Sequence, residues 1–125
     1  MANFGRRQVM PTYTSSHAAW EKYWESEEHQ PVVIHKELLE HIESFFNDLN
    51  DKKILEVGGG MAGDSIELAK KGANMTVVDF SQKALDLVKK EAKKAKVSIK
   101  IRNEDAEKLS FPNNYFDCVF HQGLL

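Results

Sequence analysis

Cysteine, long apolar runs and a basic charge excess are all scarce in this sequence. Cys118 is the only cysteine among the 125 residues, which excludes an internal disulfide and a cysteine-based zinc site. It falls within an apolar strand pattern, so we expect a buried, inert thiol. No apolar stretch approaches the roughly 20 residues that span a bilayer. The N-terminus carries two arginines without a following apolar core, which predicts no secretory signal. We therefore expect a cytoplasmic protein with no membrane partner.

Charge of the two signs is nearly balanced. The chain has 17 Lys and Arg against 19 Asp and Glu, a net charge of −2, which predicts no nucleic-acid partner. A run of five lysines falls in a predicted helix and is interpreted as its solvated face: Lys83, Lys89, Lys90, Lys93 and Lys94. The 42% hydrophobic and 29% charged content is typical of a globular protein of one domain.

Residues 1–50 predict an N-terminal arm and two helices. The first helix begins near residue 16 and places Trp20, Tyr23 and Trp24 on one face. We interpret that face as packing on the body of the protein, with a lid over a ligand as the alternative. Apolar residues at helical spacing predict a second helix after Pro31, which extends as far as residue 49 and ends at Asn50-Asp51.

Two histidines lie within this second helical pattern. His35 and His41 are six residues apart, off the i, i+4 spacing that places two imidazoles on one helical face. We therefore predict surface or half-buried histidines, and no metal site.

A glycine-dense turn follows the first predicted strand, residues 53–57. The turn contains Gly58, Gly60 and Gly63. A helix over residues 64–71 follows the turn, and Gly72 is expected to stop it. A tight turn needs backbone angles that a Cβ disfavours, and bare backbone lets a ligand approach closely. The helix N-terminus directs unpaired N–H groups at whatever lies over the turn. This order of strand, turn and helix is typical of a nucleotide-binding α/β sheet.

Strands and helices then alternate to the end of the sequence. Further strands are predicted at residues 75–78, 97–101 and 116–120, and Ser81 is a natural N-cap for the helix between the first two. Alternation of this kind predicts parallel strands, right-handed crossovers and helices on both faces of the sheet.

The glycine pattern by itself fits two kinds of nucleotide site. Gly58-x-Gly60-x-x-Gly63 matches the dinucleotide fingerprint, and Asp79 lies 21 residues after Gly58, near the spacing of a ribose-binding acid. Three features favour a different site. Glu56 stands where dinucleotide-binding strands usually carry an apolar residue, a long helical segment precedes the first strand, and Asp105 follows the third strand beside Ala106.

Three segments in this order resemble the class I S-adenosylmethionine-dependent methyltransferases over residues 53–125. Ile54-Leu55-Glu56-Val57-Gly58-Gly59-Gly60 is similar to the family's first motif, and Val77-Val78-Asp79-Phe80-Ser81 to its second. Asn103-Glu104-Asp105-Ala106, running on to the strand near Phe120, is similar to its third motif and fourth strand. One departure is visible, because the family often has Gly where Ala62 stands, and we expect a slightly altered turn.

The resemblance implies a Rossmann-like α/β fold with strand order 3-2-1-4, and S-adenosyl-L-methionine as cofactor. The implied cofactor-binding residues are Glu56, Gly58, Gly60, Asp79, Phe80, Asp105, Ala106 and His121. Glu56 would hold the methionine ammonium group, Asp79 the two ribose hydroxyls, and Asp105 the adenine amino group. Each acid also has a plain structural interpretation, at a strand end, a helix cap or a loop. For His121 a partly buried strand-end histidine without a ligand is the simpler interpretation.

The resemblance also implies a methyl transfer to a small-molecule acceptor, with no catalytic base identified. Residues 51–125 would form an incomplete cofactor-binding domain, apparently truncated after the fourth strand. Phe116, Val119 and Phe120 would then be apolar residues on an edge strand, which favours self-association or pairing with a completing chain. The alternatives are a fragment of an NAD(P)-dependent oxidoreductase and a non-catalytic adenosyl-binding or assembly module.

Overall fold

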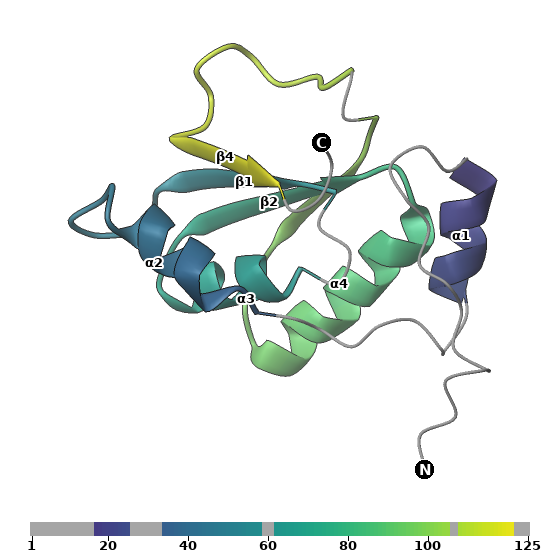
Figure 1. The fold of residues 1–125 in the computed structure, drawn as a ribbon, viewed down its shortest axis with the longest axis horizontal. Helices are drawn as coiled ribbons and strands as arrows, with labels where there is room; N and C mark the ends of the chain where they lie inside the picture. Colours follow the sequence, from purple (N-terminus) through teal and green to yellow (C-terminus); the bar gives the residue numbers. More distant parts are fainter. Residues whose placement is uncertain (1–16, 26–33, 59–61, 106–107, 122–125) are drawn as a thin grey trace.

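The computed structural model describes residues 17–25, 34–58, 62–105 and 108–121 (Figure 1). Its elements in chain order are α1 (His17–Glu25), α2 (Lys36–Glu43), β1 (Lys53–Val57), α3 (Gly63–Lys70), β2 (Asn74–Asp79), α4 (Gln82–Ala95), β3 (Lys100–Asn103) and β4 (Cys118–His121). The strands form one sheet in the order β3-β2-β1-β4, and all pairs are parallel. The predicted fold class and strand order are therefore confirmed. None of the helices in these ranges is long and apolar enough to cross a bilayer.

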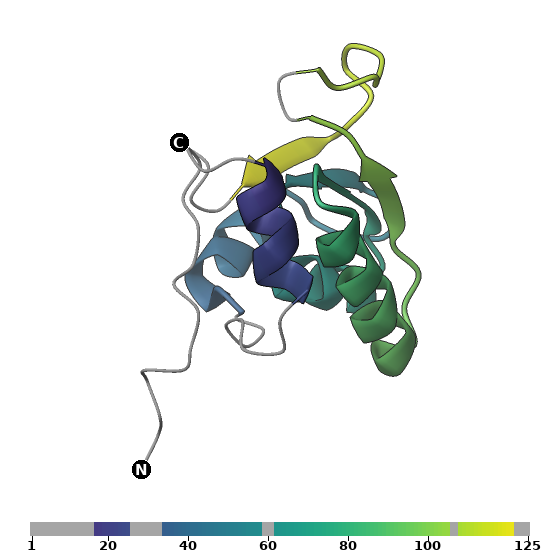
Figure 2. The same ribbon diagram turned by 90° about the vertical axis from the view of Figure 1, so that its right-hand side faces the viewer.

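Helices α2, α3 and α4 pack on one face of the sheet (Figures 1 and 2). On that face Ile54 and Met75 contact buried residues of α2 and α3, and Val77 contacts buried residues of α4. Each of the two helical crossovers, β1 to β2 and β2 to β3, connects a strand to its neighbour on the side of the sheet that ends at β3. Right-handed crossovers in one direction place their helices on the same face.

The opposite face of the sheet is covered by a loop. Leu55, Val57 and Val78 form a buried cluster there, and the partly buried apolar residues packed on it come from the segment between β3 and β4: Leu109, Phe111 and Phe116. The predicted helical layer on this second face is therefore not found within the described residues. The chain returns from β3 to β4 across this face, and the part of that crossover the structure describes is a loop (Figure 1).

Helix α2 is shorter than the sequence pattern predicted. It ends at Glu43, and the Ser44 hydroxyl donates to the carbonyl oxygen of His41 at 2.6 Å. Leu49 is buried as its apolar spacing suggested, but it reaches the core from the turn before β1. Phe45 is exposed. Residues 47–51 contain two Asn and two Asp, which favour turns over continued helix.

The ends of α3 and α4 depend on local backbone chemistry. Gly72 follows α3 with φ +94, as expected of the residue that stops this helix. Ser81 caps α4 by accepting from the Ala84 N–H at 3.1 Å, which confirms the predicted N-cap. Ala84, Leu85 and Val88 face inward, and the lysines of this helix face solvent as predicted.

Two strands begin later than the sequence indicated. β3 starts at Lys100 because the residues before it still belong to the end of α4. Lys96 follows the helix with φ +60, and the Val97 N–H donates to the Ala92 carbonyl at 3.0 Å. β4 starts at Cys118 because the ring of Phe116 belongs to an aromatic cluster with Phe111 and Tyr115. Helix α1 lies against α4 (Figure 2), and the side chains of Trp20, Tyr23 and Trp24 lie outside the described residues.

Strand β4 borders the sheet as expected. Within the described ranges it pairs with β1 alone. Phe120 is buried on the helical face, whereas Val119 points to the other face and is 57% exposed. Cys118 is half-buried, less enclosed than predicted, and burial raises the pKa of its thiol.

Candidate functional site

The predicted site residues gather at one edge of the sheet. Because all strands are parallel, their carboxyl ends meet at that edge. Glu56 is the penultimate residue of β1, Asp79 is the last of β2, and His121 is the last of β4. Asp105 follows β3 by two residues. Gly60 and Ala106 lie outside the described residues.

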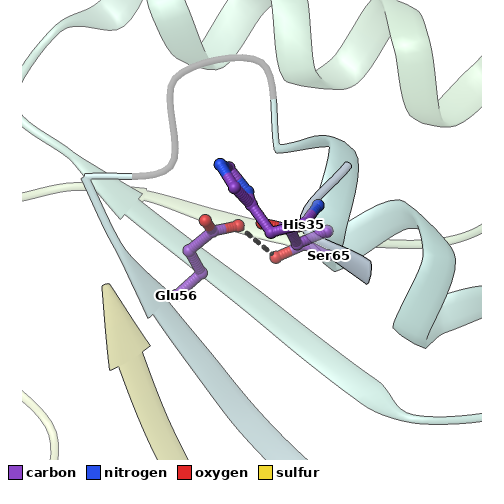
Figure 3. A network of polar contacts seen from close by, with 4 residues as sticks. His35, Glu56 and Ser65 are labelled. Carbon is purple, nitrogen blue, oxygen red and sulfur yellow. Dashed lines mark hydrogen bonds and ion pairs between the residues drawn. The ribbon is translucent and has the colours of Figure 1, made fainter. Parts of the chain in front are cut away.

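Glu56 is a buried acid held by one hydroxyl. Its side chain points to the helical face, where the Ser65 hydroxyl of α3 donates to Oε1 at 2.6 Å (Figure 3). Burial is the main reason that the pKa of Glu56 rises from 4.5 to about 8, and the negative charges of Asp64 and Asp79 add to the rise. The Ser65 hydrogen bond opposes this rise. The interpretation of Glu56 as a surface acid is therefore wrong, and the carboxyl is mostly protonated at neutral pH.

Asp79 is also buried, at the end of the neighbouring strand. One carboxylate oxygen accepts from the Ser81 N–H at 2.9 Å. The Asp79 carbonyl accepts from the Glu104 N–H at 3.2 Å, which ties the end of β2 to the chain leaving β3. The sequence offered a ribose ligand or a helix-capping acid here. The hydrogen bond from Ser81 shows that Asp79 stabilises the turn before α4. The carboxylate still lies at the carboxyl end of β2, where the other site residues gather.

The turn after β1 is tied to β2 at its first residue. The Gly58 N–H donates to the Val78 carbonyl at 2.7 Å, with φ +68 at Gly58. Ala62, the residue at which the sequence departs from the family pattern, also adopts a left-handed conformation with φ +55 and is buried. The turn therefore closes with an alanine in a conformation that glycine adopts more readily.

Asp64 and His35 form a contact that the sequence did not indicate. The backbone N–H of His35 donates to Oδ1 of Asp64 and the ring Nδ1 lies against Oδ2, both at 2.7 Å. A carboxylate only accepts, so Nδ1 carries the hydrogen. The Asp64 side chain is 3% exposed and the His35 ring 43%. His35 is half-exposed, in line with the predicted surface or half-buried histidine, but its carboxylate partner has no sequence signal.

The remaining predicted residues form the outer part of the site. Phe80 is half-buried, whereas Asp105 and His121 are exposed. His121 is thus more open than the partly buried histidine of the simpler interpretation. It pairs with Val57 in the register between β4 and β1, which places it next to the end of the central strand.

A polar network fixes the loop that carries Asp105. Arg102 donates to Glu104 at 2.8 Å and to the Ser110 hydroxyl at 2.6 Å, and its guanidinium lies 4.7 Å from the Phe111 ring centroid. The Ser110 N–H donates to Oε1 of Glu104 at 2.8 Å. Hydrogen bonding from Ser110, followed by Arg102, lowers the pKa of Glu104. These contacts tie Ser110 and Phe111 to the chain that leaves β3.

The chemistry of this edge suits a ligand with a positive group and vicinal hydroxyls. A buried acid with a raised pKa ionises readily when a cation comes to rest against it. A carboxylate at a neighbouring strand end is an acceptor for hydroxyl donors. Among the described residues, no group of three or more His, Cys, Asp or Glu side chains is arranged to hold a metal ion.

Comparison with known families and curated proteins gives concordant matches. Residues 54–125 match a family model described as "Methyltransferase domain". The chain is 35% identical over 80 residues to a ubiquinone biosynthesis O-methyltransferase of Actinobacillus pleuropneumoniae, covering 64% of this chain and 33% of that protein. It is 37% identical over 66 residues to a ubiquinone/menaquinone biosynthesis C-methyltransferase of Zymomonas mobilis, covering 52% and 27%. The chain spans about a third or less of the length of these curated relatives.

Solved structures share the fold. The PH0226 protein from Pyrococcus horikoshii superposes with a TM-score of 0.59 at 25% identity, covering 89% of this chain and 47% of that one. Magnesium protoporphyrin IX methyltransferase from Synechocystis, solved with S-adenosylhomocysteine (SAH) bound, gives a TM-score of 0.61 at 20% identity, covering 69% and 39%.

Proposed function

The chain belongs to the methyltransferase-domain family whose model matches residues 54–125, and from that premise we propose that it binds S-adenosyl-L-methionine for methyl transfer to a small-molecule acceptor. The observation that carries this proposal is the pair of buried acids, Glu56 and Asp79, at the carboxyl ends of adjacent parallel strands. Two relatives named as methyltransferases match 64% and 52% of the chain.

In this proposal, different residues at the sheet edge bind different parts of the cofactor. Glu56 holds the methionine ammonium group, and Asp79 accepts from the ribose hydroxyls. Phe80 packs against the adenine, Asp105 accepts from its amino group, and the Ala106 N–H donates to the ring. Gly58 and Gly60 let backbone approach the methionine part. His121 stands at the end of β4 as a further contact.

The bound cofactor supplies a methyl group already activated by the positive sulfonium. The work left to the chain's own residues is binding, alignment and the exclusion of water. Glu56 is suited to binding because its burial disfavours an unpaired negative charge. A bound ammonium group would compensate for the free-energy cost of that charge.

Thermal melts with and without SAH test the proposal. Ligand that binds only the folded state raises the melting temperature by mass action. We expect an upward shift for the wild type and none for Asp79→Ala. The matched control is Asp86→Ala, on the exposed face of α4, which should keep the full shift. A cooperative wild-type melt that SAH leaves unmoved contradicts the proposal, and a shift produced by NAD instead would favour the oxidoreductase.

We also propose that β4, which pairs with β1 alone among the described residues, associates with another strand, from a second copy or a completing chain. Val119 is an exposed apolar residue on this strand, and such edges template pairing. Size-exclusion chromatography with light scattering tests this. A well-folded monomer at all concentrations would contradict it, whereas association that Val119→Lys weakens would support it.

A further inference from the structure

The side chain of His35 is diverted from its own helix. His35 occupies the N-cap position of α2, where a side chain commonly accepts from the first turn, yet it makes no such bond. The ring turns instead to Asp64, which lies 29 residues later in the first turn of α3. Together with the backbone N–H, it supplies one donor to each oxygen of the carboxylate.

This arrangement fixes the Asp64 side chain. A carboxylate that is 3% exposed is costly unless it is hydrogen-bonded. With one oxygen bonded to the backbone and the other to the ring, the carboxylate cannot rotate without breaking a charge-assisted hydrogen bond. The contact therefore joins the segment before α2 to the start of α3.

Asp64 is followed directly by Ser65, the residue that holds Glu56. Two hydrogen-bonded pairs, His35 with Asp64 and Glu56 with Ser65, therefore involve consecutive residues in the first turn of α3. Figure 3 shows the pair of Glu56 and Ser65. A change in the position of that turn moves the Ser65 hydroxyl relative to the Glu56 carboxyl. Asp64 also acts on Glu56 directly through its negative charge.

We propose that His35 is a positioning residue for the cofactor site: through Asp64 it fixes the first turn of α3, and so aims the Ser65–Glu56 pair at the ammonium group of the cofactor. This inference rests on the proposed function. His35 does not itself need to touch the cofactor. His35 thereby supports the binding site, although it lies outside residues 54–125, which match the family model.

The test measures the Kd of SAH by calorimetry for His35→Ala, His35→Asn and His41→Ala. We expect His35→Ala to weaken binding about tenfold or more, the size expected for losing one hydrogen bond to a charged group. In His35→Asn the amide Nδ2 stands near the place of Nδ1, so affinity should stay within about threefold of the wild type. His41 is an exposed histidine of α2 whose ring contacts Phe45, and its loss should change nothing.

Apo melts of each variant separate positioning from folding. Should His35→Ala fail to melt cooperatively, His35→Phe takes its place, because it keeps a planar ring and removes only the donor. A folded His35→Ala or His35→Phe with wild-type affinity overturns the proposal. Failure of both to fold would also overturn it, since the contact would then serve stability alone.

A second readout works without ligand. The Glu56 carboxyl is titrated by NMR in the apo protein. Losing the His35 contact should raise its titration midpoint, because the Ser65 hydrogen bond weakens and the charge of Asp64 is less neutralised. An unchanged midpoint counts against positioning. If wild-type protein binds no SAH, the proposed function fails, while the midpoint still decides whether His35 positions Glu56.

Discussion

The Ser65 hydroxyl donates a 2.6 Å hydrogen bond to Oε1 of Glu56, and both residues are buried between β1 and α3. This is the only hydrogen bond that the described residues give to the Glu56 carboxyl. One neutral donor does not offset the burial of a negative charge. The carboxyl therefore keeps its proton in the folded protein until the pH approaches 8.

Stability should fall as the pH rises through the range in which Glu56 ionises. Its pKa is about 8 in the folded protein and near 4.5 when exposed, so the folded state binds the proton more tightly. The resulting stabilisation is fully present below pH 4.5 and lost as the pH rises to about 8. At 1.36 kcal/mol per pKa unit it is on the order of 5 kcal/mol. Urea unfolding of wild type and Glu56→Gln at about pH 5 and about pH 8.5 measures it.

Glu56→Gln should flatten this dependence, because its amide cannot ionise but still accepts from Ser65. The matched control, Glu40→Gln on the exposed face of α2, should keep the wild-type slope. A slope that Glu56→Gln leaves unchanged would show that another group causes it.

Binding of SAH should release a proton near neutral pH. The free protein holds Glu56 protonated below its pKa of about 8, whereas an ammonium group against the carboxyl favours its ionised form. Affinity should therefore increase between about pH 6 and about pH 7.5. Calorimetry in buffers of different ionisation enthalpy counts the protons, with Glu56→Gln as the variant that should release none. Binding of equal enthalpy in all buffers would contradict this.

Gly72→Ala should destabilise the protein by about 2 kcal/mol. Gly72 has φ +94, and an added Cβ would meet Asn50 Oδ1 at 2.8 Å and the Asn50 Cα at 3.3 Å. Urea unfolding measures the loss. Asn50→Ala in the Gly72→Ala background removes only the side-chain contact, so it should restore part of the stability and leave the backbone strain. Full restoration would mean that the strain at positive φ is negligible.

Lys96→Gly should stabilise the protein by about 0.5–1 kcal/mol. Lys96 follows α4 in a left-handed conformation, with φ +60, and its side chain is exposed. Glycine adopts that conformation without the penalty of a Cβ. Lys90→Gly is the matched comparison, because Lys90 is equally exposed but lies inside the helix. It should lose about 1 kcal/mol, and thermal melts with opposite shifts would distinguish the two positions.

The sequence predicted the parallel sheet and the places of its site residues because their causes are local. Alternation of apolar strands with amphipathic helices implies parallel strands, and parallel strands bring the residues after them to one edge. Glu56, Asp79 and Asp105 could therefore be placed from their positions near the ends of predicted strands. Local turn chemistry also predicted the cap at Ser81 and the stop at Gly72.

Element lengths were predicted less well where tertiary packing competes with a local pattern. Leu49 continued the helical spacing of α2, but it is buried through a turn and not through a helix. Phe116 continued an apolar strand pattern, but its ring packs with Phe111 and Tyr115 over the second sheet face. An apolar residue is buried equally well from either conformation, so its spacing alone does not set the boundary.

By itself the sequence determined which residues stand at the carboxyl edge of the sheet, because the alternation of strands and helices implies parallel strands. The strand order followed from the resemblance to the methyltransferase family. Only the tertiary structure decided the protonation of these residues and the contacts that hold them in place. The pKa of Glu56 depends on how completely β1 and α3 exclude water, and the contact between His35 and Asp64 joins residues 29 apart. Desolvation and contacts between distant segments are properties of the packed chain, and no local pattern of residue types encodes them.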